Sequence, residues 1–109
     1  MVRVLVVSPD ETIRVVRRAL VNEAGVDVET CPPHDCAQVV AARHFDALVL
    51  CRMEEGEARD IVTLFRRRNP RSRVISVRDV ADSLADENID PYDPEALLRV
   101  LRQVKSACA

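Results

Sequence analysis

Short apolar runs alternate with amphipathic segments along the chain. Residues 4–7, 47–50 and 74–77 are apolar apart from one serine, a pattern typical of strands buried on both faces of a sheet. Residues 26–30 instead alternate between apolar and polar side chains. This period of two predicts a strand near the edge of the sheet.

The segments between these runs predict helices. Ser8 can cap the first helix, with Pro9 at its first position and Glu11 completing a capping box. Gly25 is suited to end it. One face of this segment is apolar, as in an amphipathic helix. The side chains on that face are Ile13, Val16 and Leu20.

Similar signals mark the later helices. Asp35 and Gln38 form a second capping box, which predicts a short helix. A longer amphipathic helix stops before Pro70. Its apolar side chains are Ile61, Leu64 and Phe65. The last helix begins after Asp93, with Pro94 at its first position. Its inner face carries Leu97, Leu101 and Val104.

The order of these elements predicts the fold class. Strands that alternate with helices through short loops form a parallel α/β sheet wrapped by helices on both faces. Ligands and reactive groups in such folds lie at the carboxyl ends of the strands. Those ends are residues 8–10, 51–52 and 78–79.

The composition is that of one globular domain, which we assign to residues 1–109. The chain is 48% hydrophobic and 31% charged, and its length suffices for a single core. A net charge of -2 favours neither nucleic acid nor an anionic membrane. No apolar run approaches the roughly 20 residues that cross a bilayer. Without a secretory signal, we expect a cytoplasmic protein whose four cysteines are reduced.

Three segments resemble the receiver (CheY-like) domains of response regulators in two-component signalling. Residues 4–14 resemble the opening strand and helix of that family. Residues 45–50, Phe-Asp-Ala-Leu-Val-Leu, resemble the third strand, whose next residue is the phosphorylated aspartate. Residues 90–98 resemble the closing Lys-Pro-Phe motif and the start of the last helix. The resemblance covers nearly the whole chain and implies a flavodoxin-like, doubly wound sheet of four or five parallel strands.

The resemblance also implies that the phosphorylation residues have been replaced. The family uses two carboxylates to hold Mg²⁺, and the matching positions are Ser8 and Pro9. Cys51 stands in place of the phosphate-accepting aspartate, and its thiol cannot form an acyl phosphate. Arg78 replaces the switch hydroxyl, and Asp90 replaces the lysine. We therefore expect five degenerate positions, no catalytic residue, no metal and no cofactor.

The segment between Arg78 and Asp90 is short. Residues 79–89 are about half of what the family uses for a helix and a strand. They leave room for at most a turn or two of helix at 80–85 and a vestigial strand at 88–89. The Lys-Pro bond of the family is typically cis, whereas X-Pro bonds in general are cis in only about 5% of cases. From the sequence, the Asp90–Pro91 bond could therefore be either cis or trans.

Two chemical alternatives remain open at this stage. Cys51 could be a redox-active or metal-responsive thiol, activated by the positive charges of Arg52 and Arg78. The simpler interpretation is a buried residue that fills the space of the missing carboxylate. Residual phosphorylation on another carboxylate, Asp10 or Asp46, is the second alternative.

Residues 31–36 contain three potential zinc ligands. They are Cys31, His34 and Cys36. Their spacing is wider than the usual Cys-x-x-Cys, and Cys108 would have to reach them from the far end of the chain. A disulfide between Cys31 and Cys36 is disfavoured in a reducing cytoplasm. A strand-to-helix turn capped by Asp35 is the simpler interpretation.

Charged runs suggest partners without naming one. The basic run at 66–73 lacks the interleaved aromatic residues of nucleic-acid-binding surfaces. Its arginines suit a helix C-terminus. The acidic stretch 79–95 could pair with it in self-association or steer a charged partner, although a solvated loop is the simpler interpretation.

The resemblance and its departures lead us to expect a non-enzymatic, phosphorylation-independent receiver domain. It is expected to act as a protein-interaction module in bacterial signal transduction, with an unidentified protein partner or as a homodimer. The chain ends just after the last helix. A free-standing regulator and a domain of a longer protein both agree with that ending.

Overall fold

The computed structural model describes residues 1–78 and 83–108. In these residues, five parallel strands form one sheet in the order β2-β1-β3-β4-β5, which confirms the predicted flavodoxin-like α/β fold. The strands are β1 (Arg3–Val7), β2 (Asp27–Cys31), β3 (Ala47–Cys51), β4 (Arg73–Val77) and β5 (Glu87–Ile89). The helices are α1 (Glu11–Asn22), α2 (Cys36–Ala42), α3 (Glu55–Arg68) and α4 (Pro94–Ala107), with a single 3₁₀ turn, η1 (Pro33–Asp35).

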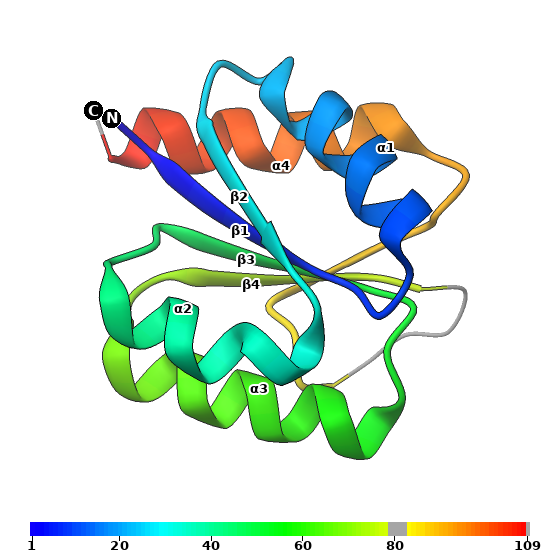
Figure 1. Ribbon diagram of the computed structural model, residues 1–109. Coiled ribbons are helices and arrows are strands. Elements are labelled where there is room, and N and C mark those ends of the chain that lie inside the picture. The colour runs from blue at the N-terminus through cyan, green and yellow to red at the C-terminus, as the bar shows by residue number, and fades with distance from the viewer. Residues whose placement is uncertain (79–82, 109) are drawn as a thin grey trace.

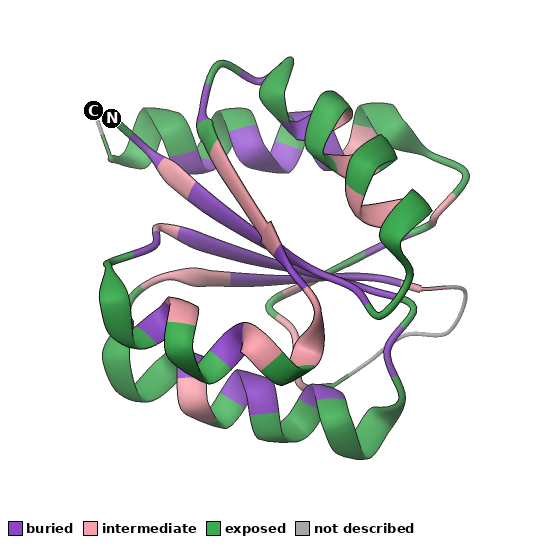
Figure 2. Cartoon of the chain, viewed as in Figure 1, coloured by how far each residue is buried: buried purple, intermediate pink, exposed green. Residues whose placement is uncertain are grey.

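Helices cover both faces of the sheet, α1 and α4 on one side and α2 and α3 on the other (Figure 1). The three central strands are therefore buried on both faces, which explains their continuous apolar pattern. Figure 2 shows this burial along β1, β3 and β4 and along the inner faces of the helices. None of the helices in the described part of the chain is long and apolar enough to span a membrane.

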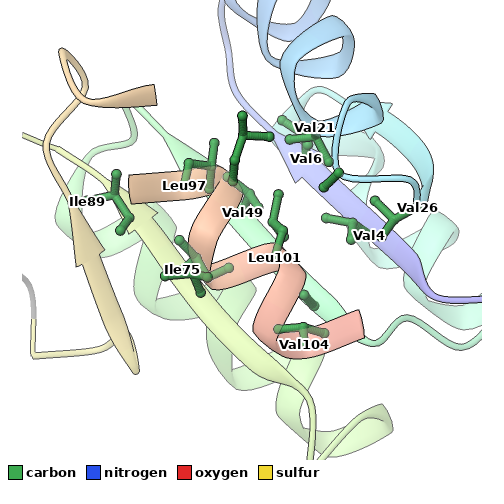
Figure 3. Close-up of a cluster of buried hydrophobic side chains, with 14 of the residues drawn as sticks. Val4, Val6, Val21, Val26, Val49, Ile75, Ile89, Leu97, Leu101 and Val104 are labelled. Atoms are coloured by element: carbon green, nitrogen blue, oxygen red, sulfur yellow. The ribbon is translucent and has the colours of Figure 1, made fainter. Parts of the chain in front are cut away.

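Side chains of alternate strand residues form two separate cores. On the α2 and α3 side, Phe45 and Phe65 are fully buried among leucine and valine side chains. On the α1 and α4 side, the predicted inner face of α4 packs against β3 and β4 (Figure 3). The side chains that meet there include Val49, Ile75, Leu97, Leu101 and Val104.

The start of α1 differs from the predicted capping box. Asp10 caps the helix in place of Ser8, because its Oδ1 accepts the N–H of Ile13 at 3.2 Å. Ser8 lies at the end of β1 and is fully buried, where its Oγ accepts the N–H of Asp10 at 3.3 Å. The helix ends at Asn22, and Gly25 follows with a φ of 76°, a left-handed conformation that favours glycine.

The other predicted caps gave mixed results. Asp35 precedes α2, but its side chain forms no capping hydrogen bond, so the second capping box was wrong. The cap of α4 is confirmed, since Oδ1 of Asp93 accepts the N–H of Ala96 at 3.1 Å.

The short fifth strand is present and pairs in parallel with β4. The residues just before it, 83–86, form turns and bends. Of the short helix predicted at 80–85, residues 80–82 lie outside the described residues. Asp86 joins this region to the start of β4, where its Oδ2 accepts the N–H of Val74 at 2.8 Å. All peptide bonds in the described ranges are trans, including Asp90–Pro91.

Candidate functional site

The five positions that the sequence predicts to be degenerate gather at the carboxyl edge of the sheet. Cys51 is the last residue of β3, and its strand neighbour Val77 pairs on the other side with Ile89. The strand ends therefore lie side by side. The other positions are Ser8 and Pro9 after β1, Arg78 after β4 and Asp90 after β5.

Cys51 lies deep in this edge. Only 1% of the residue is exposed to solvent. Burial raises the pKa of its thiol to about 11, and the positive charge of Arg17 on α1 only partly offsets this effect. In the alternative of an activated thiol, the sequence suggested Arg52 and Arg78 as the cations, whereas the cation that acts on the thiol is Arg17. Sequence reasoning missed Arg17, because the pattern of α1 does not show which of its arginines faces β3.

The end of β1 provides no obvious ligand for a metal. Ser8 is fully buried and already bonded to its neighbour Asp10, while Pro9 is exposed and has no side-chain ligand. The carbonyl oxygen of Ser8 accepts a hydrogen bond from Nη1 of Arg14 at 2.7 Å. The carboxylate of Asp10, which comes next in the chain, caps α1 through its Oδ1.

The ends of β4 and β5 are held by backbone and turn interactions. The N–H of Arg78 donates to the carbonyl oxygen of Ile89 at 3.1 Å. Asp90 is exposed, and its Oδ1 accepts the N–H of Tyr92 at 2.8 Å. A carboxylate that bonds the backbone two residues on is typical of a turn. Asp90 thus shapes the loop that leads from β5 into α4.

A groove with a volume of about 410 Å³ lies beside Cys51, between α1 and this loop. The apolar face predicted on α1 lines the groove and is only partly buried, and Val16 is 57% exposed. From the opposite side the loop contributes Tyr92, which is 83% exposed. Arg52, next to Cys51, also lines the groove and has a φ of 53°, which is uncommon outside glycine.

Arg17 connects the two walls of the groove. Its Nη2 donates to the carbonyl oxygen of Pro91 in the loop at 3.1 Å, and its positive charge lowers the pKa of the Cys51 thiol in opposition to burial. The hydrogen bond to Pro91 thus joins α1 to the loop between β5 and α4.

The potential zinc ligands do not assemble into a site. Cys31 and Cys36 are buried free thiols, whereas the side chain of His34 is 79% exposed. A hydrogen bond between the two thiols raises the pKa of Cys31 and lowers that of Cys36. Cys108 lies at the opposite edge of the sheet, near Asp46. Across residues 1–78 and 83–108, no three side chains of the metal-binding types lie together.

No protein-family model matches the chain, and no curated protein matches it. Solved structures do. The Vibrio cholerae chemotaxis protein CheY4 superposes with a TM-score of 0.80 at 20% identity, over 95% of this chain and 98% of that one. A putative pilus assembly protein from Burkholderia thailandensis gives 0.74 at 23% identity, over 97% and 99%. The Thermotoga maritima response regulator TrrA, solved with the histidine kinase ThkA, gives 0.77 at 18%, over 95% and 98%.

These structural similarities agree with the observed order of strands and helices. The chain has the CheY-like receiver fold of response regulators.

Proposed function

We propose that residues 1–109 form a single, non-enzymatic receiver domain that acts in the cytoplasm as a phosphorylation-independent protein-interaction module in signal transduction. The environment of Cys51 carries this proposal. The residue at the position expected for the phosphate acceptor is a cysteine of which 1% is exposed. Burial raises the pKa of its thiol, and Arg17 is the cation that acts on it. Neither the chemistry nor the burial of Cys51 suits phosphoryl transfer.

The surroundings of Cys51 also disfavour a magnesium site. Mg²⁺ prefers oxygen ligands, carboxylates above all. At the end of β1, Ser8 and Pro9 offer no carboxylate, and Asp10 caps α1 through its Oδ1. Arg78 and Asp90 likewise lack the hydroxyl and the amine expected at their positions.

Phosphorylation at the alternative carboxylates has little structural support. Asp46 precedes β3 and therefore lies at the opposite edge of the sheet from Cys51. Its Oδ2 accepts the N–H of Arg3 at 2.9 Å, and its Oδ1 lies 3.3 Å from Nε2 of His44. Asp10 is the helix cap already described. Both carboxylates therefore form hydrogen bonds that stabilise the fold.

A redox role for Cys51 lacks its main requirement. The thiolate is the reactive form of cysteine, and reactive cysteines are partly exposed with a lowered pKa. Cys51 is buried, and its pKa is raised to about 11. We therefore do not propose this function.

Exposed apolar side chains support the interaction role. Val15 and Val16 on α1 are 64% and 57% exposed, and Tyr92 across the groove is 83% exposed. Apolar side chains gathered on a surface are typical of binding sites. The receiver TrrA, which has the same fold, was solved in complex with a histidine kinase.

Treatment with acetyl phosphate and Mg²⁺, followed by intact-mass measurement, tests the absence of phosphorylation. We expect no phosphoryl adduct on the native chain, while a phosphorylatable receiver treated in parallel gains one. An adduct on the native chain would overturn the proposal.

The interaction role needs a separate measurement. A pull-down from the source cell with the native chain and with Cys51→Asp should recover the same partners with and without acetyl phosphate. Partners that depend on acetyl phosphate in the native chain would contradict constitutive binding.

A further inference from the structure

The groove beside Cys51 has the dimensions of a small-molecule site. Its volume of about 410 Å³ lies within the range of about 300–1,000 Å³ that such sites occupy. The floor is formed by the buried side chains of Cys51 and Val77, and the walls by Val16 and Tyr92. A mostly apolar lining with a few polar groups is the usual composition of a ligand pocket.

The charged side chains that line this groove in the described part of the chain are all positive. Among the residues that the structure describes, its lining includes two arginines, Arg17 and Arg52, and no acidic residue. The whole chain carries a net charge of -2, so the positive groove is a local feature. An anion would therefore find complementary charge here against the overall balance of the molecule.

Arg17 is the better placed of the two arginines. It is half-buried and donates to the carbonyl oxygen of Pro91. Within residues 1–78 and 83–108 it forms no ion pair. A guanidinium has five N–H donors in a planar fork that matches a carboxylate. A half-buried guanidinium without a carboxylate partner can accept one from a ligand.

We infer that this groove binds a small amphipathic carboxylate, with an apolar body of the fatty-acid type along Val16 and Tyr92 and its carboxylate on Arg17. Of the two arginines only Arg17 is half-buried, whereas Arg52 is exposed. A phosphate needs several donors around it, so one half-buried guanidinium in a mostly apolar groove suits a carboxylate better. The inference goes beyond the proposed function and does not depend on it, because binding can be measured on the chain alone.

The chain contains its own probe for this site. Tyr92 is the only tyrosine, and there is no tryptophan. Intrinsic fluorescence therefore reports on the rim of the groove alone. Titration with decanoate below its micelle concentration should change this fluorescence to saturation. Acetate, which lacks the apolar body, should cause no change. Decan-1-ol, which lacks the charge, should bind about tenfold more weakly or worse, because charged hydrogen bonds are the stronger ones.

Neighbouring residues on α1 supply matched variants. Arg17→Gln should weaken decanoate binding about tenfold or more, whereas Arg18→Gln, outside the groove, should leave it unchanged. Val16→Asp should abolish saturable binding, whereas Val15→Asp should not. Both valines are exposed, so these two variants test the groove even if Arg17→Gln fails to fold.

The inference has three outcomes that overturn it. They are no saturable change with decanoate, equal affinity for decanoate and decan-1-ol, and equal loss of binding in Val15→Asp and Val16→Asp. A negative result here leaves the phosphorylation and pull-down measurements unaffected, so the two proposals fail separately.

Discussion

Ser76 on β4 is a fully buried polar residue whose hydroxyl has no hydrogen-bond partner in the described part of the chain. A buried hydroxyl without a partner costs free energy, so Ser76→Ala should be neutral or stabilise the fold by up to about 1 kcal/mol. Ser72 is the matched control, because its Oγ donates to the carbonyl oxygen of Phe45 at 2.6 Å. Ser72→Ala should destabilise by about 1 kcal/mol in urea unfolding. Equal losses in both variants would contradict the difference between the two hydroxyls.

The thiol of Cys51 should make stability depend on pH in the alkaline range. Its pKa is raised from 9.0 to about 11 by burial, so the folded state keeps a proton that the unfolded state loses. This contribution is fully present below pH 9 and is lost as the pH rises through 11. It amounts to on the order of 2 to 3 kcal/mol.

Comparison with Cys51→Ala isolates this effect. The difference in free energy of unfolding between the native chain and the variant should shrink by that amount between pH 8 and pH 11 in urea titrations. Other titrating groups, such as Cys31, are common to both proteins and cancel. A difference that stays constant over this range would show that folding does not raise the pKa of the Cys51 thiol.

The position of Cys51 could be predicted from the sequence, but its environment could not. The apolar run before it places residue 51 at the end of a buried strand. Arg17 is one of three arginines on α1, and the helical pattern does not show which of them reaches β3. The cation at the thiol follows from the packing of α1 on the sheet, which depends on residues far apart in the chain.

Helix caps form at the scale of single elements and are testable in the same way. Asp93 accepts the N–H of Ala96, so Asp93→Ala should destabilise the fold by about 1 kcal/mol. Asp35 occupies the equivalent position before α2 without such a bond, so Asp35→Ala should cost much less. Thermal unfolding of both variants measures the difference. A loss in Asp35→Ala as large as in Asp93→Ala would contradict the assignment of the caps.

The end of α3 is joined to the start of β3 by a buried asparagine. Oδ1 of Asn69 accepts the N–H of Phe45 at 3.1 Å, and its Nδ2 donates to the carbonyl oxygen of Phe65 at 3.3 Å. Asn69→Ala removes both bonds and leaves a buried N–H without a partner, so we expect a loss of about 2 kcal/mol. The exposed Asn22→Ala is the control and should change little. Urea unfolding that shows equal stability for both would refute this role.

The strands were easier to predict than the helix faces. A period of two or a continuous apolar run identifies a strand by itself, and each predicted strand was found within one residue or two. On α1, Val16 fits the apolar stripe with Ile13 and Leu20 but remains 57% exposed, while Val21 is fully buried. The apolar residues of α1 therefore allow two inner faces, one through Val16 and one through Val21. Which of the two is buried depends on how α1 packs against the sheet and α4.

At the scale of the whole molecule, the strand order places three buried cysteines at different distances from the centre of the sheet. Cys51 ends β3, the central strand, whereas Cys31 ends β2 at the edge of the sheet and Cys36 begins α2 beside it. Cys108 follows α4 and is exposed. Edges of a fold open locally at a lower free energy than its centre, which opens only with global unfolding.

Alkylation of the native protein should follow this order. With iodoacetamide at pH 8.5 and peptide mass analysis, Cys108 should react first, Cys31 and Cys36 later, and Cys51 last. Global stabilities of at least about 5 kcal/mol imply that Cys51 reacts roughly four thousandfold more slowly than an exposed thiol, or slower still. In Cys108→Ser the fast phase should vanish, and the slow phases should remain.

The denaturant dependence of these rates separates local from global opening. The rate at Cys51 should rise with urea as steeply as the unfolding equilibrium does, whereas the rates at Cys31 and Cys36 should rise less, because local opening exposes less surface. A fast, urea-independent reaction of Cys51 would contradict its burial and would restore the redox interpretation. A slow reaction coupled to global unfolding would show that the reagent reaches this thiol only when the whole fold opens.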